Sequence, residues 1–162
     1  MDKLAIGPGY PPEIVHLDMS PTERVRTLAK NKNCTVTDIT VCVLERPRHK
    51  ELIGELRQAG ARIRLITDGD VAGIIHCAET ELTGVDMLMG MGGAPEGVLA
   101  ASALKCLGGQ IQGRLIFRTN DEKKRAEKAG IKDLNQIYGR NDMVTQEVIF
   151  AASGGTNGSM LK

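Results

Sequence analysis

Two arginines separated by one proline, Arg46 and Arg48, form the first pattern that could carry chemistry. Pro47 biases the residue before it toward extended conformations, so the turn between the two arginines is rigid. Guanidinium groups bind phosphate oxygens through paired hydrogen bonds, which makes this segment a candidate phosphate-binding site. A solvated basic turn explains the same residues, because short basic loops are common on protein surfaces.

Two carboxylates separated by a glycine, Asp68 and Asp70 around Gly69, stand directly before an expected helix. One of them could simply cap that helix. The second carboxylate has no such structural need and could bind a divalent cation or accept hydrogen bonds from sugar hydroxyls. At this point a binding role and a structural role have equal weight.

A glycine-rich stretch over residues 90–97 is the third candidate. Glycines such as Gly93 let the backbone approach a ligand closely, and the N-terminus of the helix expected from Pro95 offers free N–H groups to an anion. Glu96 would lie in the first turn of that helix, either complementing the helix dipole or binding a metal. The stretch matches neither a P-loop nor a dinucleotide-binding fingerprint.

All three motifs stand where a strand is expected to end. Hydrophobic periodicity predicts strands over 36–44, 62–67 and 85–89, followed by helices over 48–59, 71–78 and 95–107. In open α/β sheets, ligands bind beyond the carboxyl ends of the strands. Cations after one strand, carboxylates after the next and a glycine-rich turn after the third together indicate that the ligands are a phosphorylated polyol and a divalent metal.

The rest of the chain fits one layered α/β domain over residues 1–162, with a largely parallel or mixed sheet covered by helices. Ser20 and Glu23 form a capping box for a helix over 21–30. A charged helix is expected over 120–129, between weaker strands over 113–118 and 147–152. No internal repeat or long linker divides the chain.

Composition excludes several functional classes. The net charge is +1, and the chain has two Tyr, two Phe and no Trp, which argues against nucleic-acid and membrane-surface binding. No apolar run reaches membrane-spanning length and no signal peptide is recognisable, so we expect a cytoplasmic protein. The cysteines and histidines show no metal-ligand spacing.

The motifs together resemble the class II fructose-1,6-bisphosphatases. The resemblance covers the whole chain in one order, and its most specific blocks are Asp68-Gly69-Asp70-Val71-Ala72 and Gly92-Gly93-Ala94-Pro95-Glu96-Gly97, supported by Arg46-Pro47-Arg48-His49 and Gln112-Gly113-Arg114-Leu115.

This resemblance implies a fold similar to the metal-dependent, lithium-sensitive sugar phosphatases, and hydrolysis of the 1-phosphate of fructose 1,6-bisphosphate with Mn²⁺ or Mg²⁺. It implies a homo-oligomer for the full-length enzyme. Its carry-over by position assigns phosphate contacts to Arg46, Pro47 and Arg48, sugar contacts to Asp68, Gly69 and Asp70, a backbone substrate contact to Gly93, and a metal ligand to Glu96.

By the same resemblance, the chain matches the C-terminal part of these enzymes. The main catalytic residues and the other metal carboxylates are then expected upstream of the residue matching Met1. A non-catalytic sugar-phosphate-binding module is the alternative. A dinucleotide-binding oxidoreductase is disfavoured, because no fingerprint glycine loop follows the first expected strand.

Overall fold

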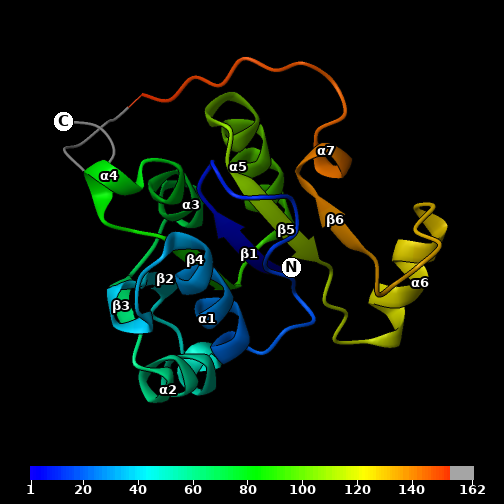
Figure 1. The fold of residues 1–162 in the computed structure, drawn as a ribbon. Coiled ribbons are helices and arrows are strands. Elements are labelled where there is room, and N and C mark those ends of the chain that lie inside the picture. The colour runs from blue at the N-terminus through cyan, green and yellow to red at the C-terminus, as the bar shows by residue number, and fades with distance from the viewer. Residues whose placement is uncertain (154–162) are drawn as a thin grey trace.

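The computed structural model describes residues 1–153, which form a mixed six-stranded sheet with helices on both faces (Figure 1). The strands are β1 Asp2–Ile6, β2 Thr40–Leu44, β3 Arg62–Ile66, β4 Met87–Met91, β5 Gln110–Arg114 and β6 Ile137–Gly139, in the order β3-β2-β4-β1-β5-β6. β2 pairs in parallel with β3 and β4, whereas β1 is antiparallel to β4 and β5, and β6 to β5. The expected α/β class with a mixed sheet is confirmed.

The helices are α1 Pro21–Lys32, α2 Lys50–Ala59, α3 Asp70–Ala78, α4 Thr80–Thr83, α5 Ala94–Leu107, α6 Asn120–Lys128 and α7 Arg140–Met143, with 3₁₀ turns η1 Val36–Asp38 and η2 Pro47–His49. The predicted capping box of α1 is confirmed. The Glu23 N–H donates to Ser20 Oγ at 3.2 Å, and the Ser20 N–H donates to Glu23 Oε2 at 2.7 Å. Such reciprocal bonds satisfy helix-end donors that lack intrahelical partners.

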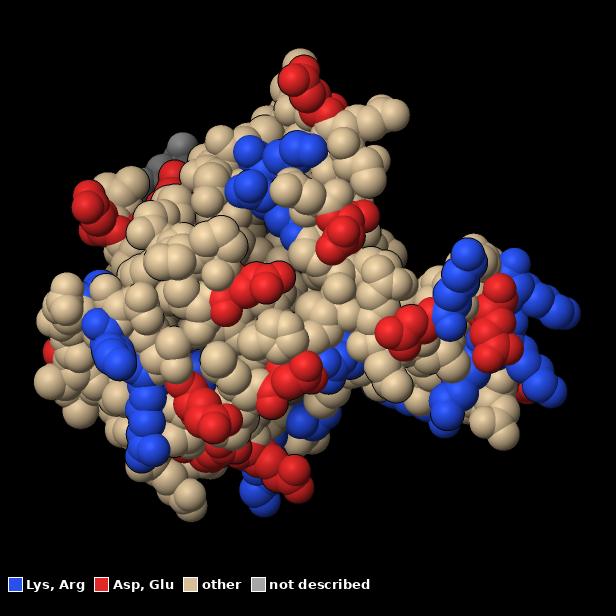
Figure 2. All heavy atoms as spheres, turned by 45° about the vertical axis from the view of Figure 1, so that its right-hand side comes forward, with Lys and Arg blue, Asp and Glu red and all other residues tan. Residues whose placement is uncertain are grey.

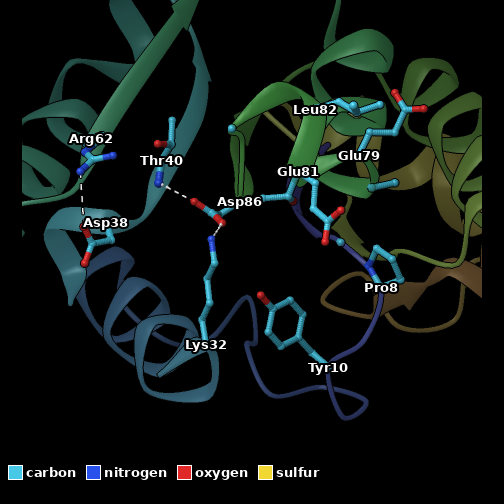
Figure 3. Close-up of a pocket in the computed structure, with 14 residues that line it drawn as sticks. Pro8, Tyr10, Lys32, Asp38, Thr40, Arg62, Glu79, Glu81, Leu82 and Asp86 are labelled. Carbon is cyan, nitrogen blue, oxygen red and sulfur yellow. Dashed lines mark hydrogen bonds and ion pairs between the residues drawn. The ribbon is translucent and has the colours of Figure 1, made fainter. Parts of the chain in front are cut away.

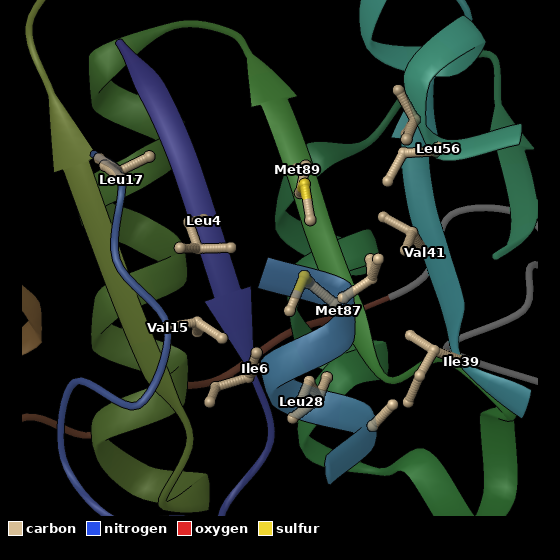
Figure 4. Packing of buried hydrophobic residues seen from close by; sticks show 13 residues of the cluster. Leu4, Ile6, Val15, Leu17, Leu28, Ile39, Val41, Leu56, Met87 and Met89 are labelled. Carbon is tan, nitrogen blue, oxygen red and sulfur yellow. The ribbon is translucent and has the colours of Figure 1, made fainter. Parts of the chain in front are cut away.

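Alternation along the strands divides the core into two layers. Leu4, Val41 and Met89 pack with the side chains of α1 and α2 on one face (Figure 4). Ala5 and Leu88 pack with α3 and α5 on the other face. Because successive strand residues point to opposite faces, each central strand supplies both layers.

Three strand predictions differ from the structure by two or more residues at an end. The strand expected over 85–89 lies at Met87–Met91. The strand expected over 36–44 starts only at Thr40, because residues 36–38 form η1. The strand expected over 113–118 lies at 110–114, so its last four predicted residues form a loop.

The strand expected over 147–152 is wrong, since these residues are irregular. The sheet edge beside β5 is occupied instead by β6, which no pattern in the sequence predicted, and Ile149 is 97% exposed. A β-branched run forms a strand only where a sheet edge is free to pair with it.

The predicted charged helix is confirmed as α6, which stands away from the main body as a lobe of mixed charge (Figures 1 and 2). Within α6 only Ala126 is buried. No helix within residues 1–153 is long and apolar enough to cross a membrane.

Strand directions bring several loops to one edge of the sheet. β2, β3, β4 and β5 all end at this edge, and β1 starts there, because Asp2 lies opposite both Met91 and Arg114. The three motifs that follow β2, β3 and β4 therefore gather at one side of the molecule, as predicted.

Candidate functional site

A hollow of about 390 Å³ opens at this edge of the sheet. We call it the Arg48 cavity; its lining residues are Met1, Arg48, Met91, Gly92, Gly93, Ile116, Arg118 and Glu122. The volume lies within the range of metabolite-binding sites. Two arginines and the N-terminus of the 14-residue helix α5 face it, which favours an anionic ligand.

Arg48 reaches this cavity from the turn after β2. Its Nε and Nη2 donate to the carbonyl oxygen of Met91 at 3.1 and 2.8 Å. These two bonds hold the guanidinium beside the end of β4. They also leave Nη1 available to a ligand, since guanidinium presents five donors in a planar fork. The orientation suits a phosphate grip.

The buried side chain of His49 fixes the same turn. Its Nε2 accepts from the Met91 N–H at 2.8 Å, and its Nδ1 lies 2.7 Å from the Leu44 carbonyl oxygen. A backbone N–H can only donate and a carbonyl can only accept, so the ring proton is on Nδ1. Gly90 makes room for the ring at φ +143°, where an added Cβ would lie 3.0 Å from Nε2.

Arg46 does not share the cavity with Arg48. Its Nη1 donates to the Glu45 carbonyl oxygen at 3.0 Å, and the side chain lines a different hollow beside α2. The two arginines are only two residues apart, but the 3₁₀ turn that starts at Pro47 directs them to different places.

The two aspartates after β3 also differ in their surroundings. Asp68 is exposed, whereas Asp70 Oδ2 lies 2.6 Å from Lys3 Nζ. The side chains of Lys3 and Asp70 are 1% and 12% exposed. The expectation that the second carboxylate has no structural need is therefore wrong, because Asp70 neutralises a buried lysine from β1.

The glycines after β4 allow these charged groups to come close. A Cβ added to Gly92 would collide with the Asp70 carboxylate, and it would lie 2.9 Å from Lys3 Nζ. A Cβ added to Gly93 would collide with the carboxylate of Glu96, which bends back toward the start of α5. Asp70, Glu96 and the glycine-rich turn thus lie together, as predicted.

Two residues of the site, Lys3 and Arg118, were not among the predicted ones. The weak strand expected over 113–118 included Arg118, although the loop after β5 carries it to the Arg48 cavity. The Arg118 N–H donates to Glu122 Oε2 at 2.6 Å, which ties this loop to the start of α6. The signal available in the sequence was the position of Arg118, a cation four residues after β5, which runs in the same direction as β4.

The described residues do not form a complete metal site. Within residues 1–153 no three His, Cys, Asp or Glu side chains are grouped to hold an ion. Glu96 is one exposed carboxylate, and Asp70 is paired with Lys3. Mg²⁺ and Mn²⁺ require several oxygen ligands, so Glu96 can supply only one of them.

A larger hollow of about 650 Å³ lies at the opposite edge of the sheet (Figure 3). Four of its six charged side chains form ion pairs: Lys32 Nζ lies 2.5 Å from Asp86 Oδ1, and Arg62 Nη2 lies 3.3 Å from Asp38 Oδ1. Asp86 Oδ2 also accepts from the Thr40 N–H at 2.8 Å. These contacts join α1 to the starts of β2 and β4, which is a structural role.

The stability contributed by Asp2, the first residue of β1, is expected to depend on pH. Burial raises the pKa of Asp2, and nearby Arg24 opposes part of this effect. The folded state therefore holds the Asp2 proton more tightly than the unfolded state, so Asp2 lowers stability as the pH rises through its folded pKa. Asp2→Asn is expected to raise the melting temperature at neutral pH, with a gain that disappears at acid pH.

Asp18 is the matched control of opposite sign. Its hydrogen bond from Arg114 lowers the pKa of Asp18. Its stabilising effect is present above the unfolded pKa and is lost as the pH falls, so Asp18→Asn should lower the neutral-pH melting temperature. The melting temperatures of both variants are measured between acid and neutral pH. A change of the same sign in both variants at neutral pH would contradict the two predictions.

One protein family and several curated proteins match the whole chain. The family described as bacterial fructose-1,6-bisphosphatase, glpX-encoded, matches residues 1–162. Three similar curated proteins are each named D-fructose 1,6-bisphosphatase class 2/sedoheptulose 1,7-bisphosphatase. They come from Synechocystis sp., Synechococcus elongatus and Trichodesmium erythraeum, with identities of 42%, 41% and 40% over 175 aligned positions.

Each alignment covers 100% of this chain and 50% of the relative. The chain therefore spans about half the length of the curated relatives that it matches.

Proposed function

Because the chain belongs to the bacterial, glpX-encoded fructose-1,6-bisphosphatase family, we propose that it carries the sugar-phosphate-binding part of a fructose-1,6-bisphosphatase. The reaction is metal-assisted transfer of the 1-phosphate of fructose 1,6-bisphosphate to water, giving fructose 6-phosphate and phosphate. A bound divalent cation would neutralise charge on the reacting phosphate. The chain corresponds to the C-terminal part of the enzyme in this proposal, which also takes the full-length enzyme to be a cytoplasmic homo-oligomer.

The observation that supports the proposal best is the meeting of three chemically different strand ends at one edge of the sheet. Two glycines of this edge line the Arg48 cavity, and Asp70 and Glu96 lie against them. Arg48 follows β2, Asp70 follows β3, and Gly93 with Glu96 follows β4. A sugar bisphosphate needs cations for its phosphates, acceptors for its hydroxyls and a close backbone approach. Unrelated surface turns would not be expected to combine all three.

Individual residues have separate tasks in this proposal. Arg48 holds the phosphate that is not hydrolysed, and the exposed Asp68 accepts hydrogen bonds from the sugar. Asp70 uses the carboxylate oxygen that does not bind Lys3, and Glu96 contributes one metal ligand. The Gly93 N–H, at the N-terminus of α5, donates to the substrate.

The proposal is tested in a chimaera, because the chain spans half the length of its relatives. The 162 residues replace the matching half of the Synechocystis relative, and phosphate release is measured with Mn²⁺ or Mg²⁺. Metal-dependent hydrolysis of fructose 1,6-bisphosphate is expected. Binding of the sugar phosphate without any release would favour the alternative of a non-catalytic binding module.

Sedoheptulose 1,7-bisphosphate is a second candidate substrate, since the names of all three relatives include it. Phosphate release from this seven-carbon substrate, measured in the same assay, tests it directly.

Loss of either cavity arginine is expected to weaken substrate binding. Arg48→Gln and Arg118→Gln each remove a charged donor, and hydrogen bonds to charged groups contribute about 1.5–3 kcal/mol. The KM of the chimaera should rise about tenfold or more, with kcat less affected. Arg125→Gln, on the exposed surface of α6, is the control. An unchanged KM in Arg118→Gln would exclude a role for that residue while leaving the proposed reaction intact.

A further inference from the structure

A separate hollow of about 530 Å³ lies between α2, the turn before it and the edge strand β3. We call it the α2 groove. Among its lining residues are Glu45, Arg46, Lys50, Gly54, Arg57 and Leu65. It opens on the other side of the Pro47 turn from the Arg48 cavity, and the two hollows share no lining residue in the described part of the chain.

The groove gathers more cations than acids. Arg46, Lys50 and Arg57 face one acid, Glu45, and within residues 1–153 none of the three cations forms an ion pair. Within residues 1–153, the one hydrogen bond that the Arg46 side chain donates runs from Nη1 to the carbonyl oxygen of its neighbour Glu45. Like charges collected without partners disfavour the compact state, and a bound anion would remove that cost.

Gly54 in the middle of α2 is a second, independent observation. A glycine inside a helix costs about 1 kcal/mol relative to alanine. Packing does not require this glycine, because a Cβ added at Gly54 would meet no described atom within 4 Å apart from its chain neighbours and the backbone of its own helix. Its effect is to leave the helix backbone uncovered where Gly54 lines the groove, between Lys50 and Arg57, so that a ligand could approach closely.

We propose that the α2 groove binds a small organic phosphate at a site distinct from the Arg48 cavity. Arginine and lysine side chains supply the donors that phosphate oxygens prefer. Leu65, which is 38% exposed on the edge strand, offers an apolar wall to the organic part of the ligand. The volume is within the range of metabolite sites. This site goes beyond the proposed reaction and requires neither metal nor turnover.

The test uses inorganic pyrophosphate and the 162-residue chain. Amide chemical shifts are followed by nuclear magnetic resonance during a titration without metal. Pyrophosphate should shift the amides of Gly54 and Leu65, and the double variant Lys50→Gln/Arg57→Gln should raise the dissociation constant at these amides about tenfold or more. Gly54→Gln places a side chain at the groove without changing its charge and favours the helix, so it should weaken binding in a folded protein.

Two controls separate this site from general anion attraction and from binding in the Arg48 cavity. Arg26→Gln/Lys30→Gln removes two exposed cations from α1 and should leave the shifts unchanged. Arg48→Gln should reduce shifts at Gly93 but keep those at Gly54 and Leu65. The proposal is overturned if pyrophosphate does not shift the α2 amides, if Lys50→Gln/Arg57→Gln binds like the original chain, or if Arg48→Gln abolishes both sets of shifts together.

Discussion

Replacing Asp70 with Asn should destabilise the protein by about 3–5 kcal/mol, because it leaves a buried ammonium group without its counter-charge. Lys3 is 1% exposed and its Nζ lies 2.6 Å from Asp70 Oδ2, its one ion-pair partner within residues 1–153. Urea unfolding at neutral pH, followed by circular dichroism, measures the change in the free energy of unfolding.

Asp68→Asn is the matched control. Asp68 lies two residues earlier in the same turn and is exposed, so its substitution should change stability by less than about 0.5 kcal/mol. The double variant Lys3→Met/Asp70→Asn removes both charges and should recover much of the loss. If Asp70→Asn unfolds at the same urea concentration as the original chain, the buried pair is not stabilising.

Replacing Glu96 with Gln should reduce metal-dependent hydrolysis by the chimaera by at least about 100-fold. Even groups that only support a metal ligand commonly contribute ten- to 100-fold, and Glu96 is proposed as a ligand itself. Mn²⁺ affinity, measured by electron paramagnetic resonance titration, should fall in the same variant. The helix-dipole contribution of one exposed first-turn acid is about 0.3–1 kcal/mol, too small to unfold the protein.

Glu51→Gln is the control for Glu96, since Glu51 is also an acid in the first turn of a helix, α2, but does not lie against the glycine-rich turn after β4 as Glu96 does. It should show the same small loss of stability and full activity. Unchanged Mn²⁺ affinity and turnover in Glu96→Gln would remove Glu96 from the metal site and leave it as a helix-end acid.

Local patterns in the sequence determined most of the elements around the site. The capping box at Ser20 and Glu23, the glycine that ends α2 and the proline in the first turn of α5 each act over only a few residues. Such signals can be read without knowing the fold. The same applies to the positions of the three motifs, because each follows a strand and the carboxyl ends of parallel strands share one edge.

Local patterns failed where pairing between distant segments decided the outcome. β1 has two charged residues among its five and was not predicted, although it is central in the sheet. Residues 147–152 have a strand-like composition but pair with no strand of the described sheet. A strand is defined by its partner, and partners are chosen by the whole fold.

The tertiary structure alone decided which charged groups meet. Lys3 and Asp70 are 67 positions apart, so nothing local to Asp70 indicates its partner. Arg46 and Arg48 are nearly adjacent, yet the turn at Pro47 sends them to separate hollows, while Arg118 arrives beside Arg48 from the end of β5. Spacing in the chain fixes which loop a side chain belongs to, whereas strand register and helix packing fix the direction in which it points.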